Sequence, residues 1–183
     1  MKLLRTIQLD PSDTFVFERA AEPGEWAVSG SFVFWNEDTS ALQGKARTAF
    51  RGGFLGVQSL GWSTLVQIVE ASERDYQDVV ELLADRLVTN FGAPTPDEAK
   101  AAAEAEVAFA SSLCSHPIDT LIAVHRAEEN GEIREQFRSL KRKDGPAPLR
   151  AFSFLEVADE EDEPGERVDL VTLGRQNSDN KTK

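Results

Sequence analysis

Apolar side chains alternate with other residues along the segment 62–69, and they occupy both faces of the strand that this segment predicts. Trp62 and Val66 share one face, while Leu65 and Val69 share the other. Apolar and β-branched residues on both faces are typical of a strand that is buried on two sides. We therefore expect this strand to lie at the centre of the hydrophobic core.

A helix is predicted directly after this strand, over residues 72–91. Its apolar positions recur at steps of three and four residues, which places them in one stripe along a helix. Ser72 can cap the N-terminus with Asp75 in the position of the capping-box acid, and Gly92 can end the helix. The stripe consists of Tyr76, Val79, Val80, Leu83, Leu87 and Phe91.

A second helix is predicted over residues 96–114. Thr95 can cap it, Pro96 stands at the first helical position, and Glu98 is the capping-box acid. The segment that follows is rich in alanine, the best helix former. Since the intervening loop 92–94 is short, the two helices should form a hairpin.

The dipeptide Asn130-Gly131 stands between two alternating segments, which is the preferred signal for a β-hairpin turn. A turn centred there pairs apolar with apolar and basic with acidic side chains on one face, so both pairs indicate the same register. The predicted pairs are Val124 with Phe137, His125 with Gln136, and Arg126 with Glu135.

Shorter patterns predict further strands over residues 3–9, 15–18, 26–35, 48–57, 149–157 and 168–173. The sequence therefore predicts an α+β fold, in which a largely antiparallel sheet carries two consecutive helices, about 72–91 and 96–114, on one face. We expect a single domain over residues 1–173 and a disordered polar tail over residues 174–183.

The composition narrows the classes of partner. A formal charge of −12 argues against nucleic acid and against anionic membrane surfaces. No apolar segment approaches the roughly 20 residues that span a bilayer, and the N-terminal residues lack the apolar centre of a signal peptide. A single cysteine suits a reducing compartment. These features favour a cytoplasmic protein with no metal and no cofactor.

The lone cysteine, Cys114, lies close to His116 in the sequence. A catalytic thiol would have to be exposed and paired with an oriented histidine, and a metal site would need more imidazole or thiolate ligands than this chain has. A cysteine near a helix end is more often a small buried apolar residue. We therefore predict a structural role for Cys114 and no catalytic residue here.

One segment is a candidate for binding. Arg51, Gly52 and Gly53 combine a guanidinium with permissive backbone, an arrangement that can hold an anion. The alternative is a structural bulge in a strand. Aromatic walls for such a pocket would come from nearby strands. The predicted ligand-binding residues are Arg51, Gly52, Gly53, Trp35, Phe54 and Trp62.

Three segments carry a resemblance to a family of proteins. They are residues 1–21 (MKLLRTIQLDPSDTFVFERAA), 26–35 (WAVSGSFVFW) and 51–54 (RGGF). They are similar to an uncharacterised family of small acidic alphaproteobacterial proteins, a domain of unknown function, over most of the chain up to about residue 140. The resemblance implies a bacterial, cytoplasmic setting, and it implies no activity or site.

Because no combination of acid, base and nucleophile emerges, the sequence favours a non-catalytic cytoplasmic accessory or protein-interaction module. Its partner would be another protein, and an enzyme of metabolism would fit this setting. The alternative is a protein or enzyme that binds a small anion or small molecule at the Arg51–Gly53 segment. Whether the chain is an enzyme, and whether it forms a homo-oligomer, are left open.

Overall fold

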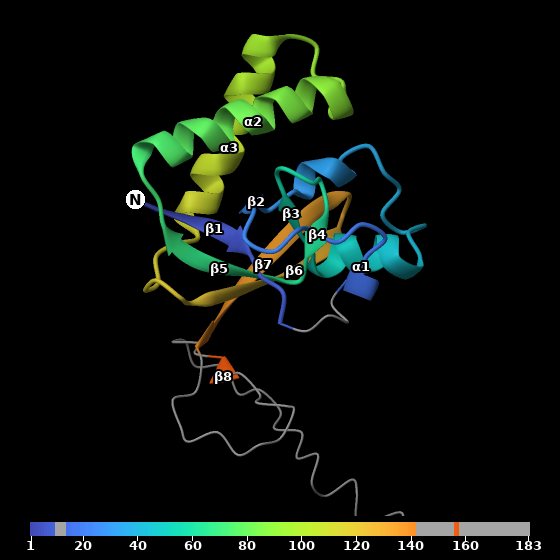
Figure 1. Cartoon of the computed structure of the whole chain (residues 1–183). Coiled ribbons are helices and arrows are strands. Elements are labelled where there is room, and N and C mark those ends of the chain that lie inside the picture. Colours follow the sequence, from blue (N-terminus) through green and yellow to red (C-terminus); the bar gives the residue numbers. More distant parts are fainter. Residues whose placement is uncertain (10–13, 142–155, 158–183) are drawn as a thin grey trace, which may run out of the picture.

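The computed structural model describes residues 1–9, 14–141 and 156–157. An antiparallel sheet forms its centre, a hairpin of two long helices stands on one side of the sheet, and a shorter helix lies at the other end (Figure 1). The predicted strand 168–173 and the predicted tail 174–183 lie outside the described residues, and the domain limits of 1–173 stay a prediction.

The strands are β1 (Lys2–Thr6), β2 (Trp26–Val28), β3 (Phe54–Gly56), β4 (Trp62–Ser63), β5 (Leu65–Glu70), β6 (Leu121–Glu129), β7 (Glu132–Lys141) and β8 (Glu156–Val157). The helices are α1 (Gly44–Gly52), α2 (Glu73–Phe91), α3 (Pro96–Ser112) and the 3-10 helix η2 (Ser31–Phe34). The strand order is β4-β3-β2-β1-β5-β6-β7-β8, and the paired strands are antiparallel. The predicted α+β class with a largely antiparallel sheet is confirmed.

The β6–β7 hairpin has the predicted register. Val124 pairs with Phe137, His125 with Gln136, and Arg126 with Glu135. The turn residues Asn130 and Gly131 both have positive φ angles, of 55° and 81°. A two-residue type I′ hairpin turn requires the left-handed conformation at both of its central residues. Asn and Gly adopt this conformation at little energetic cost.

The two predicted helices form with Ser72 and Thr95 as their N-caps; the predicted capping box is present at Ser72, whereas the Glu98 carboxylate accepts from the Thr95 hydroxyl over 2.9 Å. The backbone N–H of Asp75 donates to Ser72 Oγ over 3.1 Å, and the Asp75 carboxylate accepts from the Ser72 N–H over 2.8 Å. The Glu98 N–H donates to Thr95 Oγ1 over 3.2 Å. Helix α3 ends at Ser112, two residues earlier than predicted. The side chains that these helices bury are Val79, Val80, Leu83, Leu87, Ala99, Ala103, Val107 and Ala110.

The strand predicted over residues 62–69 is interrupted at Thr64, and the prediction that it is buried on both faces is wrong. Val66 and Ile68 are fully buried in the main core beneath the helix hairpin. Leu65 and Val69, which point to the other face, are only half-buried. The reason is that the helix hairpin covers one face of this strand and leaves the other partly open.

Two further strand predictions are wrong or too long. Residues 15–18 form the end of a 3-10 helix, a turn and a bend, and Phe17 packs into a second, smaller core cluster. The strand predicted over 26–35 ends at Val28, because Gly30 has a φ of 77° and turns the chain into η2. A side chain at Gly30 would also lie 2.6 Å from the Cβ atom of Leu55.

Helix α1 was not predicted. The segment 48–57 reads as a glycine-rich strand, but its first five residues belong to α1 and only Phe54–Gly56 form a strand, β3. Two adjacent residues of α1, Ala49 and Phe50, are buried in the second core cluster. Tertiary packing of these two residues therefore outweighs the low intrinsic helix propensity of the glycine-rich segment. Of the strand predicted over 149–157, only β8 lies within the described residues.

Candidate functional site

The segment Arg51-Gly52-Gly53 is the C-terminal end of α1, and this position changes what its backbone can bind. The Gly53 N–H donates to the carbonyl of Ala49 over 2.9 Å. A Cβ atom at Gly53 would lie 2.7 Å from the Trp62 ring, so this glycine is explained by close packing. The end of a helix presents carbonyl groups and the negative end of the helix dipole, which disfavours an anion.

The carbonyl groups at this helix end bind a cation of the protein itself. The side chain of Arg126 is fully buried, with 0% of its surface exposed. Its Nη1 donates to the carbonyls of Phe50 over 3.1 Å and Gly53 over 2.6 Å. Its Nη2 donates to the backbone carbonyl of Ser29 and, over 3.3 Å, to Ser29 Oγ. Arg126 therefore caps α1 and ties it to the sheet.

Two carboxyl groups accompany this guanidinium. Arg126 Nε donates to Glu135 Oε1 over 2.6 Å, and the Ser29 hydroxyl donates to the same carboxylate. Glu106 of α3 lies near this pair, and its Oε2 atom is buried without a hydrogen-bond partner among the described residues. Burial, followed by the charge of Glu135, raises the pKa of Glu106 to about 7, although Arg126 opposes this. The arrangement is a structural ion pair of Arg126 and Glu135, with the buried carboxyl group of Glu106 beside it.

The six predicted ligand-binding residues do not form one pocket. Phe54 is fully buried in the main core, and Trp62 stacks on Phe34 with ring centroids 5.3 Å apart. The two predicted glycines serve the end of α1. Trp35 and Arg51 are exposed, Trp35 to 73%, and they line two different hollows. The aromatic walls expected around Arg51 are therefore part of the core, and an anion at Arg51 stays a prediction.

Arg51 lines a surface hollow of about 320 Å³ between α1 and β6. Arg47, four residues earlier and hence on the same side of the helix, lines it too, as does His125. Neither arginine has an ion pair or a side-chain hydrogen bond within the described part of the chain. Of the two hydroxyls in the hollow, that of Thr39 donates to the Glu128 carboxylate and that of Ser40 donates to Asp38.

Two more arginines continue this basic surface along β7. Arg134 and Arg138 alternate with Glu135 and Phe137, so they point to the same outer side as His125, whose partner Gln136 stands between them. Arg134 forms an exposed ion pair with Glu129, at 3.0 Å. We name this surface the cationic face, and its members are Arg47, Arg51, His125, Arg134 and Arg138.

Only Arg51 of the cationic face was predicted from the sequence. Arg47 could have been found from its spacing of four residues, but only if the helix had been recognised. His125, Arg134 and Arg138 follow from the predicted register, which places them on one side of the hairpin. The contact between the β6–β7 hairpin and α1 has no signal in the local sequence of either element.

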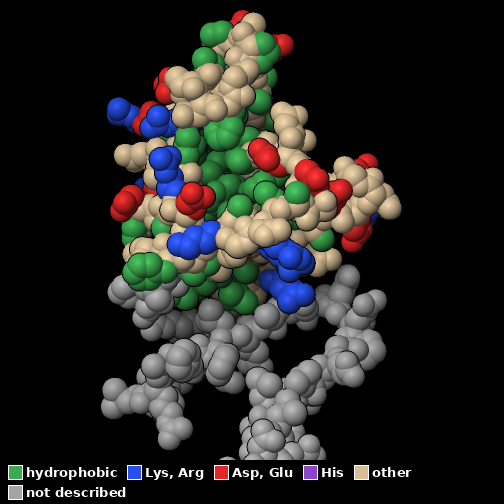
Figure 2. Space-filling view, turned by 90° about the vertical axis from the view of Figure 1, so that its right-hand side faces the viewer, with side chains coloured by type: hydrophobic (Ala, Val, Ile, Leu, Met, Phe, Trp, Pro, Cys, Tyr) green, Lys and Arg blue, Asp and Glu red, His purple; other side chains and the backbone are tan. Residues whose placement is uncertain are grey.

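A neighbouring hollow of about 390 Å³ contains the exposed Trp35. Thr39 and Glu128 line both hollows, so Trp35 lies beside the cationic face. Figure 2 looks at the side of the molecule that carries α1. It shows hydrophobic side chains gathered below the helix hairpin, with acidic and basic side chains around them.

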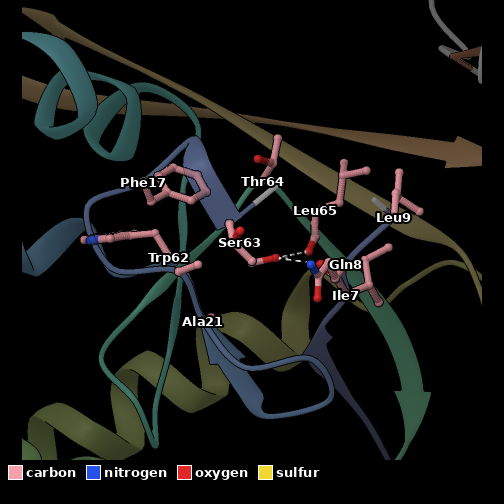
Figure 3. Close-up of a pocket in the computed structure, with 11 residues that line it drawn as sticks. Ile7, Gln8, Leu9, Phe17, Ala21, Trp62, Ser63, Thr64 and Leu65 are labelled. Atoms are coloured by element: carbon pink, nitrogen blue, oxygen red, sulfur yellow. Dashed lines mark hydrogen bonds between the residues drawn. The ribbon is translucent and has the colours of Figure 1, made fainter. Parts of the chain in front are cut away.

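A third, smaller pocket of about 170 Å³ lies where β1 ends and β5 begins. Its wall is mainly apolar and includes Ile7, Phe17, Trp62 and Leu65 (Figure 3). The Ser63 hydroxyl at this pocket donates to the carbonyls of Leu65 over 2.7 Å and Ile7 over 3.1 Å. The described residues of the lining include no acidic, basic, histidine or cysteine side chain, and they leave room for a small apolar group.

The prediction that Cys114 is a buried structural residue is confirmed. Its side chain is 3% exposed, and Sγ donates to the carbonyl of Ala110 over 3.4 Å. Burial raises the pKa of the thiol to about 11, which keeps it protonated and poorly nucleophilic at neutral pH. In the described ranges, no three His, Cys, Asp or Glu side chains come together as a metal-ligand set would.

Comparison with known proteins identifies a family. A family model described as "Family of unknown function (DUF6505)" matches residues 1–158. No curated protein and no solved structure matches the chain. Among the residues that the structure describes, no helix combines the length and the apolar character needed to cross a bilayer.

Proposed function

The chain belongs to the DUF6505 family of unknown function, and we propose that it is a protein-interaction module that binds an acidic group of a partner protein at the cationic face. One observation carries this proposal. Arg47 and Arg51 are exposed, stand on the same side of α1, and have no ion pair among the described residues, in a chain with a formal charge of −12.

The chemistry of the two arginines favours a carboxylate. A guanidinium presents a planar fork of N–H donors that matches a carboxylate or phosphate group in two parallel hydrogen bonds. Two such groups one helical turn apart, with His125 opposite, offer donors from two sides of the hollow. Positive side chains gathered on one surface also lessen, at that surface, the repulsion of acidic molecules by a chain of net charge −12.

The neighbouring Trp35 supports a protein partner over a small anion. Tryptophan and arginine are enriched among the residues that dominate binding energy at protein interfaces. A small anion would need further donors inside the hollow, but the hydroxyls of Thr39 and Ser40 already donate to Glu128 and Asp38. The binding of a small anion or small molecule is therefore the second candidate function.

The proposal includes a non-catalytic accessory role in the bacterial cytoplasm, beside a metabolic enzyme. Two observations support a non-catalytic role. The buried polar residues Arg126 and Glu135 hold α1 on the sheet, and the raised pKa of Cys114 keeps its thiol protonated. The single cysteine of the sequence suits a reducing compartment. The excess of acidic residues supports a partner that is neither nucleic acid nor an anionic membrane.

The experiment uses a peptide of six acidic residues with one central phenylalanine as the probe, measured by calorimetry. Replacing Arg51 by alanine should weaken binding roughly tenfold, the equivalent of one charge-assisted hydrogen bond of about 1.4 kcal/mol. Arg47→Ala should act in the same direction, and added salt should weaken binding to the parent protein. Unfolding by urea should show that Arg51→Ala leaves stability nearly unchanged.

Arg74→Ala is the matched control, because Arg74 is also an exposed arginine on a helix but pairs with Asp78 on α2. This variant should bind the peptide as the parent does. Equal binding by the Arg51→Ala and Arg74→Ala variants would refute the proposed site. Tight binding of phosphate, a simple carboxylate or a nucleotide, lost in Arg51→Ala, would favour the second candidate function.

A further inference from the structure

The direction of β8 bears on what occupies the cationic face. β8 pairs antiparallel with the end of β7, with Val157 opposite Leu140 and Glu156 opposite Lys141. Along β7, residue numbers fall from Leu140 toward the hairpin turn. The backbone at Val157 therefore heads toward this turn along the free edge of β7, the strand that carries Arg138 and Arg134.

The sequence that follows β8 is complementary in charge to this surface. Residues 159–163 read Asp-Glu-Glu-Asp-Glu, and they begin two residues after Val157. They lie outside the described residues, and one residue beyond the segment that the family model matches. Five consecutive acidic residues thus follow β8, whose direction along β7 leads toward the level of Arg138 and of Arg134, the latter already ion-paired with Glu129.

The distances allow contact. Four residues along β7 separate Leu140 from Gln136, which is level with His125, and this is about 13 Å. Two strand spacings, about 10 Å, separate β8 from β6. The direct path is therefore roughly 16 Å, while the six residues from Val157 to Glu163 can span up to about 20 Å.

We propose that the acidic segment 159–163 binds the cationic face of its own chain and competes there with the acidic group of the partner. This inference rests on the proposed function, because it names the competitor for the same site. Since the segment is tethered, its effective concentration at the face is high, and a free acidic ligand must displace it. This contact within the chain is autoinhibitory. The affinity for a partner then depends on how much more strongly the cationic face binds the acidic group of the partner than it binds segment 159–163.

The test compares three full-length proteins with the same acidic peptide. The first is the parent. The second has the acidic segment neutralised by D159N, E160Q, E161Q, D162N and E163Q. The third is a matched control that loses the same five charges at exposed positions elsewhere, by E18Q, E70Q, E81Q, D85N and E104Q.

The neutralised protein should bind the peptide roughly tenfold more tightly than the matched control, because only the former frees the face from a tethered competitor. The matched control measures how much of any gain comes from the lower net charge alone. Equal affinity of the neutralised and control proteins would overturn the inference. If Arg51→Ala also binds like the parent, the proposed function fails as well, so the two failures are distinguishable.

A second measurement does not depend on the peptide. The chain has two histidines, and the ring C–H resonances of His125 report on the cationic face at constant pH. Neutralising residues 159–163 should shift the His125 resonances and leave those of His116 unchanged, whereas the matched control should shift neither. An unmoved His125 resonance in the neutralised protein would contradict the contact within the chain.

Discussion

The guanidinium of Arg126 determines how α1 meets the β6–β7 hairpin. A helix end leaves carbonyl groups without partners inside the helix, and here a buried arginine donates to two of them, those of Phe50 and Gly53. Glu135 balances its charge. A buried ion pair contributes little compared with apolar residues of the same volume, but removing one of its partners is costly.

Replacing Arg126 by alanine should therefore lower the free energy of unfolding by about 3–5 kcal/mol, because the carboxylate of Glu135 and several carbonyls would lose their partner. Urea unfolding measures the change. Arg134→Ala is the control, since its ion pair with Glu129 is exposed and should contribute within about 1 kcal/mol. A loss below about 1 kcal/mol for Arg126→Ala would contradict the assigned role.

If Arg126→Ala does not fold, Glu135→Gln gives a milder test of the same cluster. This substitution keeps an acceptor for the guanidinium but removes the balancing charge. It should destabilise the protein by less than Arg126→Ala and by more than Arg134→Ala. An effect no larger than that of Arg134→Ala would show that the charge of Glu135 is of little importance to Arg126.

Glu106 makes stability depend on pH. Its folded pKa is raised to about 7 from an ordinary value of 4.5, by burial and by Glu135. A group with a raised folded pKa binds its proton more tightly in the native state, so its contribution is fully present below pH 4.5 and is lost as the pH rises through about 7.

The free energy of unfolding should therefore fall between pH 5 and pH 8 in the parent relative to Glu106→Gln, whose amide does not ionise. The slope from this one group is at most about 1.4 kcal/mol per pH unit. Glu104→Gln, on the exposed side of the same helix, should keep the pH dependence of the parent. Parallel pH profiles of the parent and Glu106→Gln would contradict the raised pKa of Glu106 in the folded protein.

At the scale of the elements, α2 and α3 are the parts whose sequence and structure agree most closely. Caps at Ser72 and Thr95 begin the helices, and four residues of the predicted α2 stripe (Val79, Val80, Leu83 and Leu87) are buried in the main core. Each signal is local, because a cap involves three or four residues and the stripe repeats within each turn. Local signals of this kind can be read without knowledge of the rest of the fold.

Leu83 tests this stripe. It is fully buried near the middle of α2, so Leu83→Ala should lower the free energy of unfolding by about 2–5 kcal/mol through lost transfer energy and the cavity that remains. Urea unfolding decides the matter, with exposed Val88→Ala on the same helix as the control. Similar losses for the two variants would mean that the stripe does not face the core.

The hairpin and α1 show where prediction from the sequence succeeds and where it fails. The pairing of Arg126 with Glu135 followed from the turn residues and from complementary charges. The complete burial of Arg126 could not be predicted in the same way. It depends on α1, which is more than seventy residues away in the chain. The helical segment 44–52 was hidden by its glycines and by having only two adjacent buried residues, Ala49 and Phe50.

At the scale of the whole molecule, the class of fold was predictable and the surface was not. The period of the apolar positions indicates whether a segment is a strand or a helix and which of its side chains are buried. Together with the turn and cap residues, these periods predicted an antiparallel sheet with a helix hairpin. The cationic face joins α1, β6 and β7. It exists only because non-local packing brings Arg51 and His125 to the same hollow, and this information is absent from any single stretch of sequence.

The central position of β1 has a consequence for how the molecule folds. β1 lies between β2 and β5, and its residue Lys2 pairs with Glu70. The helix hairpin and the β6–β7 hairpin close short loops, whereas this pairing must close a loop of almost seventy residues. Loop closure of this length carries a larger entropic cost, and topologies with many distant contacts fold slowly. During synthesis, β1 therefore leaves the ribosome well before β5, and the β1–β5 pairing cannot form until β5 has also emerged.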